Sequence, residues 1–445
     1  MAATDPRQII DESNMSTRQW IVIVLMVLLN ALDGFDVLSS AFAAPGISAE
    51  WGIPRAELGI VLSAELVGMG FGSVLLGGMA DKWGRKPAML FCLVVMASGM
   101  FLASLAAEVW TLTCWRFLTG LGIGGMLAAI NAVTAETSSR SGRSLAMALM
   151  VIGYPLGAVV GGIVAQKWLL VHYDWRAVFD FGGVVTVIMI PLIMYFVPET
   201  PAYYAARRPA GALEKINKSL KALKLSSIDA LPPEKGTADK PKVWDILSKP
   251  ELRKVTLLLA FGYMCHTITF YYILKWAVQI VADFGYSQPD AASVLTVANV
   301  GGAIGGGLFG FLMKKWGIKA PTVVMLVLGS IAVAAFGIAK ETLWGWQMAT
   351  FLTGFFTNAA IVGYYSAFAL GFPAYARATG TGVVLGVGRL GAAGSPILAG
   401  FLFNLLGNDQ LFVVSTIMAL GSIVAMILLL VLPMRDADVE LAKAG

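Results

Sequence analysis

Charged residues are scarce in this chain of 445 residues. Lys, Arg, Asp and Glu make up 13% of it, whereas a soluble protein carries about 25%. Hydrophobic residues make up 58%, and the mean hydropathy is +0.76. This balance excludes an ordinary soluble protein and indicates a membrane protein that crosses the bilayer many times.

Cysteine is scarce as well. The three cysteines, Cys92, Cys114 and Cys265, all lie in apolar segments, so the sequence predicts neither a disulfide framework nor a metal site. We expect no cleaved signal peptide, because the first 19 residues are polar and no small-residue cleavage site follows the first apolar segment. The net charge of +5 requires no nucleic-acid partner, because its distribution has a simpler cause.

Apolar segments long enough to cross a bilayer, which takes about 20 residues, recur along the whole chain. We predict twelve helices near 20–42, 55–80, 88–107, 111–135, 145–169, 176–197, 254–281, 289–313, 320–339, 344–370, 380–406 and 410–433. The prediction is an all-α membrane protein with two six-helix halves, 20–197 and 254–433. A cytoplasmic loop, 198–253, joins them, and cytoplasmic tails occupy 1–19 and 434–445. The first part of the loop predicts an amphipathic surface helix.

The basic residues predict the orientation. With the N-terminus in the cytoplasm, 25 of the 32 Lys and Arg residues fall on the cytoplasmic side, four fall outside and three lie within helices. Cytoplasmic loops of membrane proteins carry such an excess. We therefore expect both termini in the cytoplasm. We also expect the helices to lie in the inner membrane of a bacterium, and we expect a monomer because the sequence gives no strong reason for an oligomer.

Two short sequences recur at nearly one spacing. KWGRK at 82–86 returns as KWGIK at 315–319, and RFLTG at 116–120 returns as TFLTG at 350–354. The two halves are thus predicted to be repeats of one unit. Parallel six-helix repeats place a substrate site between them near the middle of the membrane.

Several motifs together resemble those of a known family. GGMADKWGRKP at 77–87 matches the loop motif that follows the second helix in the major facilitator superfamily. RFLTGLGIGG in the fourth helix, and DWRAVF and PET around the sixth, strengthen this resemblance. DGFD at 33–36 resembles an element of the aromatic acid:H⁺ symporters, which import benzoate, hydroxybenzoate or protocatechuate. The resemblance implies import of a small aromatic carboxylate with protons, by alternating access and without a cofactor.

Charged residues within the apolar segments are candidates for proton coupling, because a charge at bilayer depth is costly. Counting about 1.5 Å per residue places Asp33, Asp36 and Arg116 at similar heights. We hypothesise that Asp36, with Asp33, pairs with Arg116 and carries the proton; the alternative is a purely structural salt bridge. Glu65, at mid-depth in the second helix, has three interpretations: it lines the cavity, joins the Arg116 network, or is protonated and inert.

Arg389, near mid-depth in the eleventh helix, is the predicted anchor for a substrate carboxylate, since Arg binds carboxylates through two hydrogen bonds. The alternative is a structural role facing the cytoplasmic cavity. His266 is a candidate for a ring hydroxyl or the proton path. We expect Lys275, near the outer end of its helix, to extend to the interface. Aromatic rings and one amide are further candidates for contact with the substrate: Phe35, Tyr154, Phe270, Tyr271, Tyr272, Asn358, Tyr364, Tyr365 and Phe368.

The charged turn after the second helix predicts a gate. Contacts between helix ends in the two halves can hold the cytoplasmic side shut until they break. The residues concerned are Asp81, Gly84, Arg85, Lys86, Glu136 and Arg140. For Arg85 and Lys86 the alternative is a role in orientation alone.

Three other functions stay open at this point. A porter of sugars or aliphatic organic acids would share the fold. Arg389 favours an anion over a sugar, but the DGFD element leaves the aromatic ring of the substrate unproven. A membrane sensor and a membrane enzyme are more remote alternatives. The enzyme is disfavoured because the sequence has no HExxH, no paired Cys and His at metal-ligand spacing, and no Ser, His and Asp at one depth.

Overall fold

The computed structural model describes residues 5–232, 243–339, 342–373 and 375–433. Within these ranges the chain is helical, and long helices occupy all twelve predicted positions. A helix satisfies all its backbone hydrogen bonds internally, as a segment surrounded by lipid must. The predicted tail 434–445 and the part of the predicted loop at 233–242 lie outside the described residues.

The N-terminal half contains six long helices. They are α2 (Thr17–Trp51), α3 (Arg55–Leu75), α5 (Arg85–Ser104), α6 (Val109–Thr137), α7 (Arg143–Val164) and α9 (Arg176–Phe196). The short α4 (Met79–Trp83) follows α3, and a π-helical turn (Ala165–Leu169) with α8 (Leu170–His172) extends α7. Ser16 and Gln19 form a capping box that fixes the start of α2.

The C-terminal half repeats this order. Its long helices are α13 (Pro250–Asp283), α14 (Gln288–Trp316), α15 (Lys319–Phe336), α16 (Leu343–Gly371), α17 (Arg377–Leu406) and α18 (Leu411–Val431). A contact made by corresponding lysines supports the predicted repeat. The Lys86 ammonium donates to the Met194 carbonyl at 2.7 Å, and that of Lys319 donates to the Leu430 carbonyl at 2.7 Å.

Eleven spans among the described residues are long and apolar enough to cross a membrane. The twelfth long helix is α16, whose Trp, Tyr, Asn and Thr residues lower its hydropathy. It packs against α14 and α15 within the bundle, and several of its polar residues, Thr350, Thr353, Thr357 and Tyr364, are buried there. The chain is therefore a multi-pass membrane protein with the predicted two sets of six helices.

The polar stretch between the halves begins with surface helices. They are α10 (Pro201–Arg207) and the amphipathic α11 (Ala212–Ala222), which confirms the predicted surface helix. Ile216 and Leu220 of α11 are buried against Ile10 of α1 (Pro6–Glu12). A further short helix, α12 (Val243–Ser248), precedes α13.

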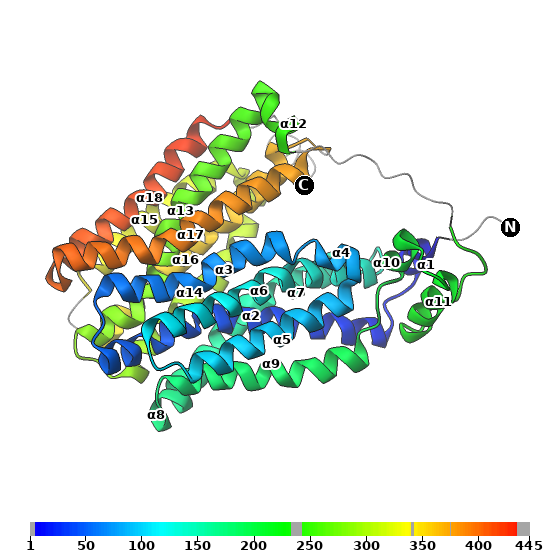
Figure 1. Cartoon of the computed structure of the whole chain (residues 1–445). Helices are drawn as coiled ribbons and strands as arrows, with labels where there is room; N and C mark the ends of the chain where they lie inside the picture. The colour runs from blue at the N-terminus through cyan, green and yellow to red at the C-terminus, as the bar shows by residue number, and fades with distance from the viewer. Residues whose placement is uncertain (1–4, 233–242, 340–341, 374, 434–445) are drawn as a thin grey trace.

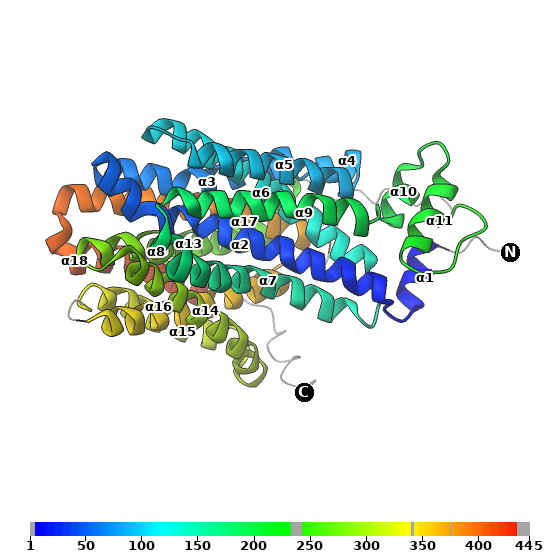
Figure 2. The same ribbon diagram turned by 90° about the horizontal axis from the view of Figure 1, so that it is seen from below.

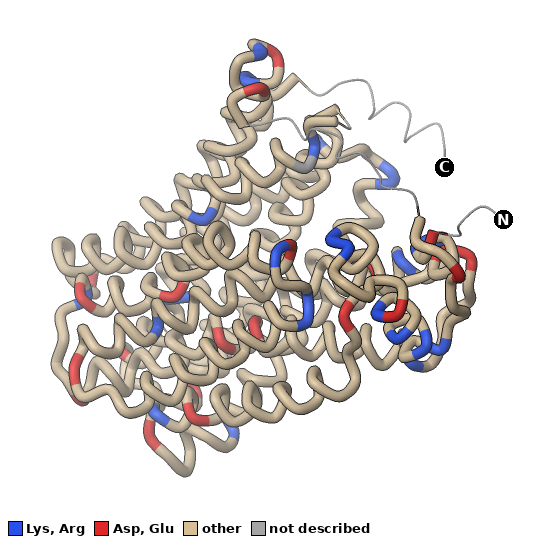
Figure 3. Tube along the Cα trace, turned by 45° about the vertical axis from the view of Figure 1, so that its right-hand side comes forward, with Lys and Arg blue, Asp and Glu red and all other residues tan. Residues whose placement is uncertain are grey.

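The two halves lie side by side and diverge toward one end (Figures 1 and 2). We name the end that carries α4, α10, α11 and α12 the loop end, and the opposite one, where α2 ends and α3 begins, the Arg55 end. Figure 3 shows many of the Lys and Arg residues gathered at the loop end near the N-terminus. The halves lie closest toward the Arg55 end.

Glycines bring α3 and α17 together at the Arg55 end. A Cβ atom on Gly59 would lie 2.5 Å from the Pro396 carbonyl oxygen, and one on Gly400 would lie 2.5 Å from that of Arg55. Only glycine allows backbones to approach this closely. At the same end Arg55 forms an ion pair of 2.6 Å with Asp283 of α13.

Candidate functional site

A cluster of three buried charges joins the two halves, and we call it the charge triad: Glu65 of α3, Arg116 of α6 and Lys275 of α13. All three side chains have 0% exposure. The Glu65 carboxylate accepts from the Arg116 guanidinium through one oxygen and from the Lys275 ammonium through the other. Lys275 also donates to the Val37 carbonyl of α2.

The position of Lys275 corrects the prediction that it extends to the interface. Its place near the end of α13 allows that role, but the helix is turned so that the side chain points into the protein. An ammonium buried this deeply needs a carboxylate partner, and Glu65 supplies one from the other half. The sequence gives no direct signal for this rotation.

Arg116 is held by four groups of the N-terminal half. Its Nε atom donates to Ser40 Oγ at 2.9 Å, and Nη1 lies 2.9 Å from Met100 Sδ. Nη2 donates to the Asp36 backbone carbonyl at 2.8 Å and to the Glu65 carboxylate. Of the three interpretations of Glu65, the structure therefore supports membership of the Arg116 network.

The predicted ion pair of Asp36 with Arg116 is wrong. Only the Asp36 backbone carbonyl contacts Arg116, and the Asp36 carboxylate lies against Gly182 of α9. The carboxylates of Asp33 and Asp36 are buried, and within the described part of the chain neither has a hydrogen-bond partner. Asp36 still lies close enough to Arg116 for an electrostatic interaction. Of the three buried carboxylates near Arg116, those of Asp33, Asp36 and Glu65, only the Glu65 carboxylate contacts it within the described part of the chain.

Arg389 lies among tyrosine side chains at the interface between the halves. Its guanidinium reaches across to α3 and donates to the Met69 carbonyl at 2.5 Å. It interacts electrostatically with the hydroxyl groups of Tyr263, Tyr271 and Tyr365. No acidic side chain is within salt-bridge distance of it among the residues described.

Aromatic residues from both halves meet near Arg389. The hydroxyl of Tyr154, from α7 of the N-terminal half, interacts with that of Tyr271 from α13. Tyr263 donates to the Tyr365 hydroxyl at 3.3 Å. Thus three of the predicted contact residues, Tyr154, Tyr271 and Tyr365, come together around the predicted anchor. Tyr263, which sequence reasoning missed, belongs to the same group, and it lies eight residues before Tyr271 on one face of α13.

Other predicted contact residues are occupied by packing inside the C-terminal half. The two His266 ring nitrogens lie 2.8 Å from Ser422 Oγ and 2.9 Å from the Thr357 carbonyl. The Tyr272 hydroxyl lies 2.8 Å from Ser415 Oγ. Since these polar atoms already have buried protein partners, the structure argues against both as substrate contacts.

Four further candidates are also structural in this arrangement. The Tyr364 hydroxyl donates to the Ala425 carbonyl at 3.0 Å, and the Asn358 amide donates to the Gly302 carbonyl at 2.7 Å. Phe35 packs edge-on against Phe181, and Phe368 packs edge-on against Tyr263. Phe270 packs edge-on against Tyr271 and so borders the tyrosine group, as Phe368 does through Tyr263.

The predicted gate residues lie at the loop end. Arg85 forms ion pairs with Glu136 at 2.8 Å and with Asp81 at 3.3 Å. Thr200 Oγ1 donates to the other Glu136 oxygen at 2.5 Å. All of these partners belong to the N-terminal half or directly follow it, so the predicted bonding between halves is not seen in this conformation. The same residues instead join α4, α5, α6 and α10.

Glu199, which sequence reasoning placed only within PET, caps α5. Its carboxylate accepts from the backbone N–H groups of Arg85 at 3.0 Å and Lys86 at 3.1 Å. Gly84 allows this approach, because its φ is 112° and a Cβ atom there would lie 2.2 Å from Glu199 Oε2. Burial raises the pKa of Glu199, and the N–H groups that it accepts from partly offset that effect. Arg140 joins the loop end through its backbone N–H, which donates to the Asp11 carbonyl at 3.1 Å.

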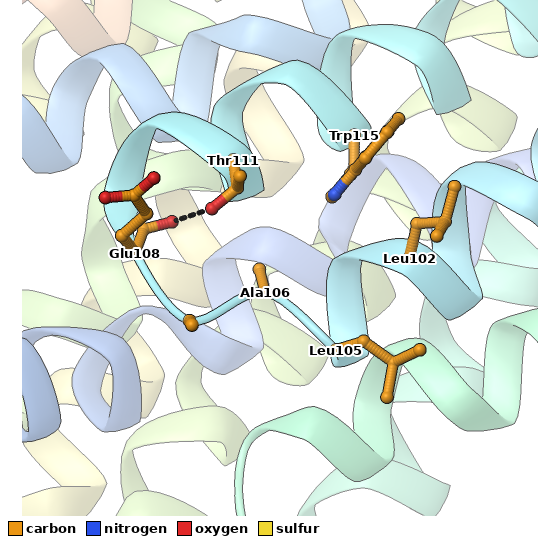
Figure 4. A pocket seen from close by; sticks show the side chains of 7 residues that line it. Leu102, Leu105, Ala106, Glu108, Thr111 and Trp115 are labelled. Atoms are coloured by element: carbon orange, nitrogen blue, oxygen red, sulfur yellow. Dashed lines mark hydrogen bonds between the residues drawn. The ribbon is translucent and has the colours of Figure 1, made fainter.

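A hollow of about 350 Å³ lies apart from these groups, at the turn between α5 and α6 (Figure 4). The residues that line it include Leu102, Leu105 and Trp115. Thr111 Oγ1 donates to the Glu108 carbonyl at 2.9 Å beside it. This surface hollow contains none of the predicted site residues.

Comparison with known proteins identifies the family of this chain. The family model described as Major Facilitator Superfamily matches residues 25–348 and 259–445. The chain belongs to the major facilitator superfamily. It is a transporter and not an enzyme. Among solved structures, the xylose transporter of E. coli in a partially occluded inward-open conformation is similar, with a TM-score of 0.71. That likeness covers 95% of this chain and 99% of the other at 14% identity, so it supports the fold alone.

Several curated members of the superfamily are similar along most of their length. A gallate transporter of Pseudomonas putida is 29% identical over 437 residues, which are 96% of this chain and 95% of that protein. A 4-hydroxybenzoate transporter of Pseudomonas putida is 28% identical and covers 87% of each chain. A benzoate transport protein of Acinetobacter baylyi is 26% identical, covering 89% of this chain and 86% of its own.

Proposed function

We propose that this transporter imports a small aromatic carboxylate together with protons, by alternating access. The similar transporters of gallate, 4-hydroxybenzoate and benzoate support the substrate class. The observation that carries the proposal is Arg389, a cation at the interface of the halves whose charge interacts with the hydroxyl groups of Tyr263, Tyr271 and Tyr365. A guanidinium suits the carboxylate of such a substrate, and the rings suit its benzene ring.

Proton coupling is assigned to Asp36, with Asp33 beside it. An ionised carboxyl group that is buried without hydrogen bonds is costly, so these two residues are suited to hold a proton. The electrostatic interaction of the Asp36 carboxylate with Arg116, which it does not contact directly, connects its charge to the charge triad. Glu65, whose oxygens are both engaged, acts as the fixed counter-ion in this scheme.

The orientation is inferred from the sequence distribution of Lys and Arg, of which 25 fall in segments predicted to be cytoplasmic. The loop end then faces the cytoplasm and the Arg55 end faces outward, in the inner membrane of a bacterium. Because the halves are joined at the Arg55 end, this conformation corresponds to the state that is closed to the outside.

Uptake into proteoliposomes tests the proposal. With an inward proton gradient, we expect accumulation of radiolabelled 4-hydroxybenzoate or benzoate that a protonophore abolishes. Uptake of xylose or an aliphatic acid in its place would support the alternative porter. Asp36→Asn should abolish proton movement driven by the substrate, whereas the control Asp174→Asn, at an exposed ion pair, should not. Normal proton movement in Asp36→Asn would remove Asp36 from the mechanism.

Substrate affinity tests the anchor. Arg389→Lys keeps the charge but loses the planar pair of donors, and a charged hydrogen bond contributes about 1.5–3 kcal/mol. We therefore expect affinity to fall by about 10- to 100-fold. Arg377→Lys at the exposed start of the same helix is the control. Equal affinity in the two variants would contradict the assignment.

A further inference from the structure

Two ion pairs at different depths connect α3 and α13 across the interface between the halves. The outer one, Arg55 with Asp283, lies at the helix ends and is partly exposed. The inner one, Glu65 with Lys275, is fully buried. It lies about 15 Å from the start of α3, since ten residues at 1.5 Å each separate Glu65 from Arg55.

The two contacts of Glu65 differ in kind. Its contact with Arg116 lies within one half, where α3 and α6 meet backbone to backbone: a Cβ atom on Gly120 would lie 2.1 Å from the Glu65 carbonyl oxygen. These two residues therefore move together. Its contact with Lys275 spans the halves, so separation of the halves breaks that contact and leaves the other intact.

We propose that Lys275 is a positioning residue of the transport cycle, whose ion pair with Glu65 closes the Arg55 end and must break for that end to open. The proposal rests on the proposed function, because it assumes alternating access. When Lys275 withdraws, Glu65 keeps Arg116 as its partner, so the N-terminal half retains a paired carboxylate. The interaction of Lys275 with Val37 of α2 adds a second point of contact that the same movement releases.

Two single-cysteine reporters test the proposal in the full chain with Cys92, Cys114 and Cys265 replaced. The outer reporter is Gln279→Cys, one turn from Lys275 toward the Arg55 end, where the native side chain has 3% exposure. The inner reporter is Gly386→Cys, one turn from Arg389 toward the loop end, where an added Cβ meets nothing within 4 Å. A membrane-impermeant maleimide is applied to right-side-out vesicles for the first reporter and to inverted vesicles for the second.

We expect Lys275→Met to raise the labelling rate of the outer reporter by about tenfold and to lower that of the inner reporter, because the population shifts toward the outward-open state. Lys275→Gln should have the same effect on both labelling rates, and it replaces Lys275→Met in the test if the Met variant fails to accumulate. Lys275→Arg, which keeps the charge, should label like the parent. General loosening of the structure would instead raise both rates.

The proposal is overturned if both rates stay at the parent values in Lys275→Met and Lys275→Gln, or if both rates rise. The labelling is measured without substrate and without a proton gradient. A parent protein that takes up no aromatic acid would therefore refute the proposed function and leave this result standing. Conversely, normal uptake with unchanged labelling would refute only the role of Lys275.

Discussion

The charge triad makes a quantitative prediction about stability, because its three side chains are buried and only one is an anion. In Glu65→Gln, an amide replaces the carboxylate that accepts from both Arg116 and Lys275. Two cations then remain buried without a counter-ion in contact. Removal of one member of a buried ion pair costs about 3–5 kcal/mol, since it leaves an uncompensated charge.

A triple variant separates this cost from the value of the ion pairs themselves. Glu65→Leu, Arg116→Met and Lys275→Met together replace all three charges with side chains of similar size. Such replacement of a complete buried cluster is often neutral or stabilising by about 1–4 kcal/mol. We therefore expect the triple variant to be more stable than Glu65→Gln and to transport nothing.

Unfolding of the purified proteins in detergent, followed by tryptophan fluorescence at increasing denaturant, measures both effects. The control is Asp174→Asn, which removes an exposed charge and should change stability by less than about 1 kcal/mol. A Glu65→Gln variant as stable as the parent, or a triple variant that is the least stable of the set, would contradict this role of the charge triad.

Two further substitutions test assignments made from contacts. Gly84→Ala should destabilise the loop end by about 1–3 kcal/mol, because the φ of Gly84 is 112° and a Cβ atom there would meet Glu199. The control in the same unfolding measurement is Gly78→Ala, since a Cβ atom on Gly78 would meet nothing within 4 Å. Tyr272→Phe should lose the hydrogen bond to Ser415 and about 1 kcal/mol of stability, and its substrate affinity should stay unchanged. A tenfold loss of affinity would instead indicate that Tyr272 contacts the substrate.

Depth along each helix was predictable from the sequence, but rotation about the helix axis was not. Counting residues at about 1.5 Å each placed Asp33, Asp36 and Arg116 at similar heights, and Glu65 was predicted at mid-depth in its helix. The structure agrees that Asp36, Glu65 and Arg116 are neighbours. Which carboxylate meets Arg116 depends on the direction in which each side chain points. That direction is decided by the packing of α2, α3 and α6 against one another. Lys275 shows the same dependence on helix rotation, since its depth was compatible both with a side chain at the membrane surface and with one in the protein interior.

The structural roles of His266 and Tyr272 had a signal in the sequence. Ser415 and Ser422 lie seven residues apart on α18, and they face Tyr272 and His266, which lie six residues apart on the antiparallel α13. Small hydroxyl residues at matched heights on two adjacent helices offer a buried polar ring a partner. Recognising that match requires knowledge that α13 and α18 are neighbours, which the repeat alone does not supply.

The acidic residues inside the helices are distributed unevenly between the two halves. The N-terminal half places Asp33, Asp36 and Glu65 within its helices, whereas the acidic residues in the described part of the C-terminal half lie at helix ends. The interior cations of the C-terminal half, Lys275 and Arg389, both reach across to the other half. Lys275 meets a carboxylate there, whereas among the described residues of that half Arg389 has a hydrogen bond to a backbone carbonyl and no carboxylate partner. A carboxylate brought in by a substrate would therefore supply the anion that Arg389 lacks, and it would do so where both halves can contact it.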